Sequence, residues 1–525
     1  MSRRAGLLIP LFSCCSTTSW GIGDIGDIPS VTGWLADAGA RVLQLLPLNE
    51  MAPGQQSPYS AISAMAIDPV YLRVTDVPDF EAAGGEEALD DSDRLALSRA
   101  RAAGRVDYAA VRQVKRAALQ RAFNRFYCDE WQRDSARARA LRAFVCQQAW
   151  WIEDYSLFRA VHARESERPW SEWPPDLQAR DPMAIDRARR ELTREVVFYQ
   201  YLQWLAAMQW ARAREQARGV ELFGDLPFMV DGDSADVWAR QEQFSLDVTV
   251  GAPPDAFSVH GQDWGMPLYR WDVIERDEFR WLRQRARRSA DLFDGFRIDH
   301  LVGFYRTYGN PRDDRRPFFT PPDEASQRAL GERLLAVFRE PGAEIVAEDL
   351  GTVPDFVRAS LARLAVPGFR VFRWERYWHT DGQPFRDPVE YPPASVATSG
   401  THDTEPLATW WQHAPADDRR KMSRLATIQR VAGGRDLNTV PYDPDVRDVI
   451  LEALFASASD LVVLPIQDLF GWSDRINKPA TVDDKNWTYR LPWPIDRLHE
   501  IPQARERQER VRAWAQGYAR MEHGC

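Results

Sequence analysis

Residues 293–304 read Phe-Asp-Gly-Phe-Arg-Ile-Asp-His-Leu-Val-Gly-Phe, and the first half of this stretch has the form of a short buried strand. Arg297 and Asp299 are two residues apart, so on an extended chain their side chains point to the same face. A neighbouring guanidinium favours the ionised form of a carboxylate. Because an ionised carboxylate is costly to place at the end of an apolar strand, the pattern fits either a structural Arg–Asp pair or a catalytic group.

Seven further apolar runs of this kind end in polar or charged residues. Amphipathic, helix-like segments such as 277–292 and 323–340 separate most of them. Strands that alternate with helices form a parallel sheet, and eight such units predict an α/β fold of the closed (β/α)8 TIM barrel type. The eight predicted strands are residues 5–12, 41–48, 220–228, 294–299, 344–349, 369–374, 395–401 and 461–467.

The interval between the second and third runs has a different composition. It is rich in Arg, Ala, Glu and Gln, with aromatic residues at helical spacing. We expect residues 76–185 to be an inserted helical subdomain, and residues 1–75 and 186–525 to form the catalytic barrel. Pro and charge concentrate at 312–324, which predicts a surface loop. The long helices predicted in the interval are residues 111–127, 136–163 and 183–218, and the last of them is expected to join the barrel layer.

The bulk composition excludes some classes of partner. Asp plus Glu number 77 against 67 Lys plus Arg, a net charge of −10. Nucleic acid and anionic membranes are therefore not expected as partners, because phosphate binding needs a basic surface. No stretch approaches the length of a membrane-spanning helix. The 21 Trp residues are many for one chain, and Trp in loops suits flat apolar ligands such as sugar rings.

The five Cys residues are odd in number and scattered, so they indicate neither a zinc site nor a disulfide framework. A reducing cytoplasm is the expected location. Residues 1–12 have a faint signal-peptide pattern, but the apolar run is short, contains Pro10 and is better explained as the first strand. We expect a monomer or a weak homo-oligomer.

Carboxylates follow several of the predicted strands. In a parallel barrel, working residues lie at the carboxyl ends of strands, so these side chains are expected at one rim. An isolated Asp in such a place is more often the N-cap of the next helix, but several with two histidines are harder to explain in that way. The residues at these ends are Asp225, Asp299, His300, Glu348, Asp349, His402, Asp403 and Asp468.

Paired carboxylates without metal-ligand spacing favour glycoside chemistry. One carboxylate attacks the anomeric carbon, a second donates a proton to the leaving oxygen, and a third stabilises the oxocarbenium-like charge. The metal-dependent alternative would use His300, His402 and Asp403 as ligands. It lacks the His-x-His or His-x-x-x-His pattern that is common in barrel metal sites.

The chain resembles the amylomaltases, the 4-α-glucanotransferases or disproportionating enzymes of glycoside hydrolase family 77 in the α-amylase-like superfamily. The most specific match is residues 253–271 (PPDAFSVHGQDWGMPLYRW), whereas FRIDH at 296–300 and AED at 347–349 are shared by the wider superfamily. Other matching stretches are residues 20–26, 43–48, 57–64, 198–204, 224–227, 400–403 and 475–479.

The resemblance implies a role for each residue that matches a motif. Asp299 would be the nucleophile, Glu348 the general acid and then general base, and Asp403 the transition-state stabiliser. Residues 251–271 would carry a loop that covers the cleft, shields the intermediate from water and so favours transfer over hydrolysis. The implied substrate-binding residues are Tyr59 and Asp225 on the donor side, Asp255, Phe257, Gln262 and Trp264 from the covering loop, and Arg297, His300 and His402.

The resemblance also implies the substrates: α-1,4-glucans and maltooligosaccharides, with glucose as an acceptor and with no metal or organic cofactor. Three rivals stay open: an α-1,4-glucan hydrolase on the same barrel, a noncatalytic glucan-binding protein and a metal-dependent hydrolase. The sequence departs from the usual family pattern at 301–303 (LVG), 404–406 (TEP) and 485–487 (KNW), which bears on acceptor contacts and chain-length preference.

Overall fold

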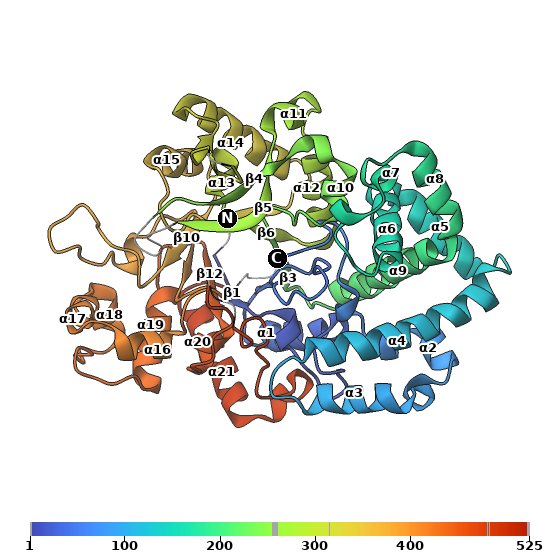
Figure 1. Cartoon of the computed structure of the whole chain (residues 1–525). Coiled ribbons are helices and arrows are strands. Elements are labelled where there is room, and N and C mark those ends of the chain that lie inside the picture. The colour runs from blue at the N-terminus through green and yellow to red at the C-terminus, as the bar shows by residue number, and fades with distance from the viewer. Residues whose placement is uncertain (1–2, 255–260, 314, 480, 482, 522–525) are drawn as a thin grey trace.

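Eight parallel strands close into a barrel at the centre of the molecule (Figure 1). The computed structural model describes residues 3–254, 261–313, 315–479, 481 and 483–521. Strand β12 pairs with β1 over five residues and closes the ring. All eight predicted strands and the (β/α)8 fold are confirmed. In order around the barrel the strands are β1 Arg4–Leu8, β12 Leu461–Pro465, β11 Ser395–Thr398, β10 Gly368–Val371, β9 Glu344–Ala347, β6 Gly295–Ile298, β3 Glu221–Leu226 and β2 Val42–Gln44.

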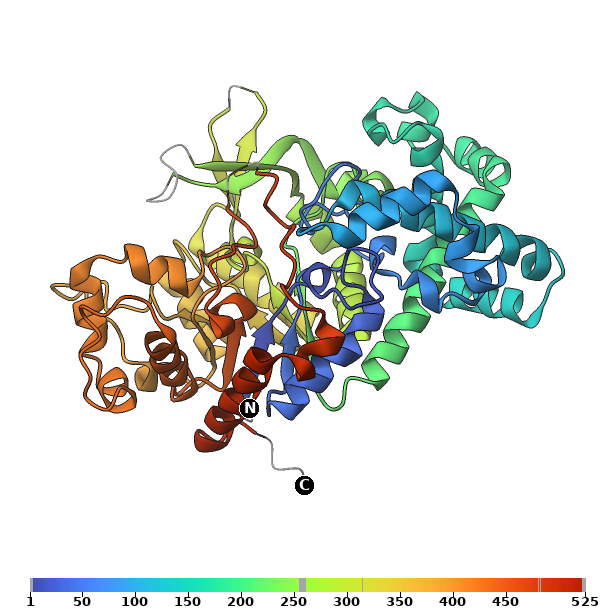
Figure 2. The same ribbon diagram turned by 90° about the horizontal axis from the view of Figure 1, so that it is seen from below.

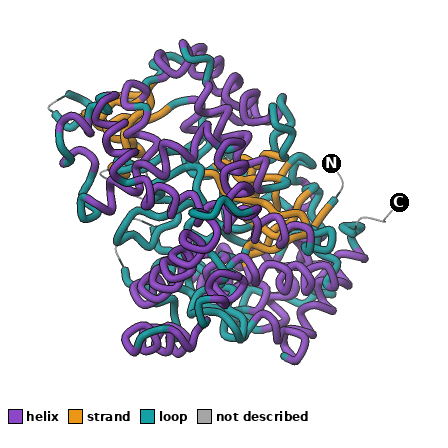
Figure 3. Tube along the Cα trace, turned by 90° about the vertical axis from the view of Figure 1, so that its right-hand side faces the viewer, coloured by secondary structure: helices purple, strands orange, loops and turns teal. Residues whose placement is uncertain are grey.

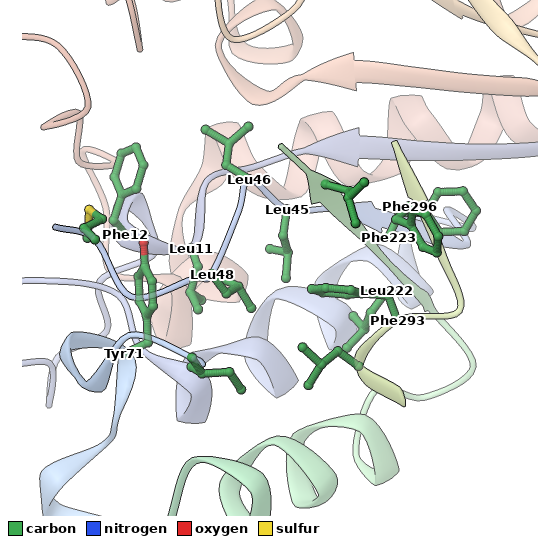
Figure 4. Packing of buried hydrophobic residues seen from close by; sticks show 14 of the residues in the cluster. Leu11, Phe12, Leu45, Leu46, Leu48, Tyr71, Leu222, Phe223, Phe293 and Phe296 are labelled. Carbon is green, nitrogen blue, oxygen red and sulfur yellow. The ribbon is translucent and has the colours of Figure 1, made fainter. Parts of the chain in front are cut away.

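The barrel strands are mainly apolar because both of their faces are covered, although β3 carries Asp225 and β6 carries Arg297. Every residue of β6 and β12 is buried. Two glycines let aromatic rings lie against the sheet: a Cβ on Gly224 would stand 2.4 Å from the Phe293 ring, and one on Gly295 would stand 2.6 Å from the Phe223 ring. Figure 4 labels Phe223, Phe293 and Phe296 among the buried hydrophobic residues of this region.

The chain between β2 and β3 is helical and lies to one side of the barrel in Figures 1 and 2. The last helix reaches the barrel layer, where Trp210 Nε1 donates to the carbonyl oxygen of Leu292 at 2.8 Å. The domain boundaries at residues 75 and 185 stay a prediction. The helices are α2 Pro78–Ala82, α3 Asp91–Ala102, α4 Tyr108–Phe126, α5 Ala136–Gln147, α6 Ala149–Arg164, α7 Pro175–Gln178, α8 Pro182–Glu191 and α9 Thr193–Glu215.

Two of the predicted long helices are each broken into two. The segment 136–163 divides at Gln148, whose φ of −103° and ψ of 10° end α5, while its side chain accepts a hydrogen bond from Trp151 Nε1. The segment 183–218 divides at Leu192, which has φ −105° and ψ 23°.

A second, antiparallel sheet stands apart from the barrel, and Figure 3 shows the strands in these two groups. It corrects the loops predicted at 251–271 and 312–324. Residues 262–266 alternate between half-buried and exposed positions, which is a strand period, whereas the resemblance had implied a loop here. The strands, in the order β5-β4-β7-β8, are β4 Phe244–Ala252, β5 Gln262–Tyr269, β7 Thr307–Pro311 and β8 Phe318–Thr320.

Further helices cover the barrel and its loops (Figure 1). Within the described ranges no helix is both long and apolar enough to cross a membrane. These helices are α1 Ile28–Asp37, α10 Ala235–Ala239, α11 Trp271–Arg276, α12 Arg280–Leu292, α13 Val302–Tyr305, α14 Glu324–Arg339, α15 Asp355–Arg363, α16 Leu407–His413, α17 Ala416–Ser423, α18 Ala426–Val431, α19 Pro444–Phe455, α20 Ile466–Phe470 and α21 Pro502–Gly517.

Candidate active site

A buried guanidinium joins three acidic side chains at the carboxyl ends of neighbouring strands. Arg297 on β6 lies in register with Asp225 on β3, and its Nη1 donates to both Asp225 carboxylate oxygens at 2.8 and 2.7 Å. Its Nη2 donates to Asp299 Oδ1 at 2.7 Å and lies 3.9 Å from Glu348 Oε2. The parallel strands therefore bring Asp225, Asp299 and Glu348 to one rim, as expected.

These carboxylates differ in exposure. The Asp225 side chain is fully buried, that of Glu348 is 15% exposed and that of Asp299 is 29% exposed. Both oxygens of Asp225 are occupied by Arg297 and by Tyr59, whose hydroxyl donates to Oδ2 at 2.7 Å. Asp225 therefore fixes its neighbours, whereas Asp299 and Glu348 reach the surface of the site.

The surroundings of Glu348 favour its protonated form. Burial raises the pKa of Glu348 to about 7, with Arg297 opposing the shift and Asp299 adding to it. Its two oxygens accept backbone N–H groups from His300 at 2.9 Å and from Leu350 at 3.2 Å, which fix the direction of the carboxyl group. A carboxyl group with this pKa exchanges protons near neutral pH.

Asp403 has the opposite electrostatic surroundings. Burial opposes its ionisation, but attraction to His402 and hydrogen bonds from His402 and Asn477 outweigh burial and lower the pKa of Asp403 to about 2. His402 Nε2 lies 3.3 Å from Asp403 Oδ2, and Asn477 Nδ2 donates to Oδ1 at 2.6 Å. The same His402 nitrogen lies 3.1 Å from the Tyr59 hydroxyl, which links Asp403 to the Asp225–Arg297 pair.

His300 borders the site on the side of the second sheet. Its backbone has a φ of +43°, a left-handed conformation that turns the chain sharply after Asp299. Burial lowers the pKa of His300 to about 4, so its ring is neutral at physiological pH. The Trp264 ring on β5 meets the His300 ring edge-to-face at 4.7 Å, and Trp264 Nε1 donates to Gln262 Oε1 at 3.1 Å. The other two residues expected from this segment, Asp255 and Phe257, lie outside the described residues.

Three residues of the C-terminal segment contact the site and were not among the expected site residues. Arg475 donates to the carbonyl oxygen of Asp403 and Asn477 to its carboxylate. The Trp487 ring lies 5.7 Å from the Tyr59 ring and 5.8 Å from the His402 ring. All three lie well beyond the end of the last barrel strand, so the expectation that working residues directly follow strands does not select them. Residues 475–479 are, however, one of the stretches that match the family.

Two rim acids have structural contacts instead. Asp468 is buried and accepts from Ser399 Oγ and from the backbone N–H of Leu407, at the start of α16, at 2.6 Å each. Asp349 is buried and accepts from the backbone N–H of Phe369 at 2.7 Å. Asp468 therefore caps the start of α16 and Asp349 holds the start of β10, so structural contacts account for both acids. In the part of the chain that the structure describes, no group of three or more His, Cys, Asp and Glu side chains is arranged to hold a metal ion.

Comparison with known proteins places the chain in a family. A family model described as 4-alpha-glucanotransferase matches residues 9–496. A 4-alpha-glucanotransferase of Thermus thermophilus is 33% identical over 512 residues, which cover 93% of this chain and 96% of the relative. One of Chlamydia pneumoniae is 30% identical over 512 residues, covering 95% and 93%.

A solved structure agrees with the sequence matches. The amylomaltase from Streptococcus agalactiae in complex with acarbose superposes with a TM-score of 0.82 at 25% identity, over 99% of this chain and 100% of that chain. The resemblance drawn from the motifs is thereby confirmed. With its eight-stranded barrel and a family match over nearly its whole length, this chain belongs to the 4-alpha-glucanotransferase family.

Proposed function

We propose that this chain is a 4-α-glucanotransferase that moves segments of α-1,4-glucans between maltooligosaccharides, or to glucose, by a retaining double displacement. The observation that carries the proposal is the Arg297 bridge. Because Nη2 is 2.7 Å from Asp299 Oδ1 and 3.9 Å from Glu348 Oε2, these two oxygens are no farther apart than the sum of those distances. This bound admits the separation of about 5–5.5 Å that retaining glycosidases have between their carboxyl groups. The family membership supports retention over inversion.

In the first half-reaction Asp299 is assigned the role of nucleophile. Arg297 holds Oδ1, while Oδ2 accepts no hydrogen bond among the described residues and is the oxygen we assign to attack. An ester bond forms between Oδ2 and the anomeric carbon as the glycosidic C–O bond breaks. Glu348 donates its proton to the leaving oxygen, a role that its raised pKa supports.

In the second half-reaction the 4-hydroxyl of an acceptor sugar attacks the ester. Glu348, now ionised, takes the proton of that hydroxyl, and the ester bond to Asp299 breaks. Asp403 is assigned the stabilisation of the positive charge that develops in both transition states, and its low pKa keeps it anionic throughout. Tyr59, His300 and His402 are assigned to the sugar hydroxyls.

The same ester can be hydrolysed by water, so the outcome depends on what reaches the anomeric carbon. Gln262 and Trp264 on β5, with the predicted contacts Asp255 and Phe257, are assigned to binding the glucan and excluding water. The family membership favours transfer over the hydrolase alternative.

The product profile of the purified protein on maltotriose tests this function. Transfer predicts longer oligosaccharides together with glucose, at a constant total of reducing ends. Rising reducing ends without longer products would indicate hydrolysis, and an unchanged substrate would indicate a noncatalytic glucan-binding protein.

A further inference from the structure

A cavity of about 610 Å³ opens away from the barrel strands, none of which lines it. It lies between the 3-10 turn Gln241–Gln243 that precedes β4 and the helices α11 and α12. Figure 1 shows α11 at the upper edge of the molecule. None of the residues around it belongs to the acidic site at the barrel rim. The side chains that line it include Arg240, Gln243, Arg276, Asp277, Arg280 and Trp281.

Arg240 brings a largely buried positive charge to this cavity, where its guanidinium lies over the Trp281 ring at 6.0 Å from the ring centre. Its side chain is 16% exposed, and within the described ranges its guanidinium makes no hydrogen bond. The nearest carboxylate, Asp236, is 4.0 Å away. Both oxygens of Asp236 are already occupied, by the backbone N–H of Ala64 at 2.7 Å and by Trp281 Nε1 at 3.0 Å. The donors of Arg240 therefore remain available to an anion, and a guanidinium binds phosphate oxygens in a two-pronged geometry.

Gln243 supplies a buried acceptor at the same cavity. The residue is 5% exposed, and its Oε1 has no hydrogen-bond partner among the described residues. Its Nε2 donates to Asp277 Oδ2 at 3.4 Å, which fixes the direction of the amide. A buried acceptor without a donor is costly, and a ligand hydroxyl is a donor of suitable size.

Charged residues gather around the cavity, and most of them are paired. Three arginines face two acidic residues, Glu242 and Asp277. Arg280 pairs with Asp277 at 3.3 Å, and Arg276 pairs with Asp272 at 3.1 Å. Arg240 is the one arginine of the three without such a close ion pair, so it is the group on which an anion would bind.

We propose that this cavity is a second ligand site, separate from the active site, for a small hydroxylated anion of the sugar-phosphate class. Arg240 binds the phosphate group, and Gln243 accepts a hydrogen bond from a sugar hydroxyl. The cavity volume lies within the range of about 300–1,000 Å³ that is usual for small-molecule sites.

Isothermal titration calorimetry of glucose 6-phosphate into the full chain tests the proposal. The expected result is saturable binding at one site that an excess of maltotriose does not displace. Arg240→Gln is expected to weaken it at least about tenfold, the loss of one charge-assisted contact. Arg240→Lys, which keeps the charge, is expected to lose less, and both variants are first checked for native thermal unfolding. Arg283→Gln is the matched control, because Arg283 on α12 is an exposed arginine that does not line the cavity and is paired with Glu340.

Five results would overturn the proposal. The wild-type chain shows no saturable binding, or maltotriose displaces the sugar phosphate. Folded Arg240→Gln binds as tightly as wild type. Glucose binds as tightly as glucose 6-phosphate, which removes the role of the anion. Inorganic phosphate binds as tightly as glucose 6-phosphate, which removes the role of the hydroxyl contact at Gln243.

Discussion

Arg297 Nη2 donates to Asp299 Oδ1 at 2.7 Å, and the two residues are only two positions apart at the end of strand β6. The guanidinium that holds this carboxylate is itself anchored by the buried Asp225. Local spacing therefore orients one oxygen of Asp299, and a strand neighbour fixes the group that does so. The strand β6 both builds the barrel and positions the proposed nucleophile.

Arg297→Ala is expected to destabilise the protein as well as to inactivate it. The change leaves Asp225 buried without its cation, and an unpaired buried charge of this kind costs about 3–5 kcal/mol. Urea unfolding at neutral pH measures the loss in free energy of unfolding. The double variant Arg297→Ala/Asp225→Ala should be more stable than Arg297→Ala alone. A double variant that is less stable than the single one would show that the unpaired carboxylate is not the cause.

The activity of the wild-type protein is expected to fall on the alkaline side near neutral pH. Glu348 must be protonated to donate to the leaving oxygen, and its pKa is raised to about 7, so the active form is lost as pH rises through about 7. The measurement is kcat/KM for maltotriose between pH 5 and 9. A profile that stays flat up to pH 9 would contradict the assignment of Glu348 as the acid.

Asn477→Ala is expected to lower kcat about 10- to 100-fold with little change in KM. The amide donates to Asp403 at 2.6 Å, and hydrogen bonds to charged groups contribute about 1.5–3 kcal/mol. Because Asp403 is assigned to the transition state, its loss of orientation should affect kcat. Steady-state kinetics on maltotriose measure the effect, with Asn124→Ala, an exposed residue of α4, as the control. A rise in KM at unchanged kcat would place Asn477 in ground-state binding instead.

A buried histidine outside the site is expected to make stability depend on pH. His162 has Nδ1 at 2.8 Å from Glu167 and Nε2 at 3.1 Å from Asp233, with Arg159 Nη1 at 3.5 Å from Nδ1. Burial would lower its pKa, but the two carboxylates outweigh burial and raise the pKa of His162 above 6.5. The folded state therefore binds this proton more tightly than the unfolded state. The stabilisation is complete below about pH 6.5 and is lost as pH rises through the raised pKa.

His162→Gln accordingly removes stability chiefly at low pH. We expect a loss of about 3 kcal/mol at pH 6, of the order found for breaking a buried ion pair, and a smaller loss at pH 9. Urea unfolding of the two proteins across this range measures the difference. His499→Gln, at a side chain that is 74% exposed, should show no such dependence. An equal loss at pH 6 and pH 9 would mean that His162 acts by packing alone.

The barrel was predictable from sequence because its strands are buried on both faces and therefore form short, mainly apolar runs between helix-like segments. The second sheet was not predictable, because β5 contains Gly265 and Pro267 and its half-buried and exposed residues alternate over only a short stretch. The helix breaks at Gln148 and Leu192 were not predictable either, because no Gly or Pro marks them in the sequence.

The expected rim residues come together where they follow strands, as Asp225, Asp299, Glu348 and His402 do. Sequence position alone could not separate Glu348 from its neighbour Asp349, which braces β10 through the N–H of Phe369. Asn477 and Trp487 reach the site through a long C-terminal segment, so only tertiary structure or a family motif could select them.

The central claim is that Asp299 carries the covalent glycosyl intermediate, and trapping this ester tests it most directly. The Glu348→Gln variant is incubated with maltosyl fluoride, whose fluoride leaves without a proton from residue 348, and the digested protein is analysed by mass spectrometry. We predict that the peptide containing Asp299 gains one maltosyl group, and that Asp299→Asn/Glu348→Gln does not. A maltosyl group on Asp225, Asp403 or any other residue, with the Asp299 peptide unmodified, would contradict the account.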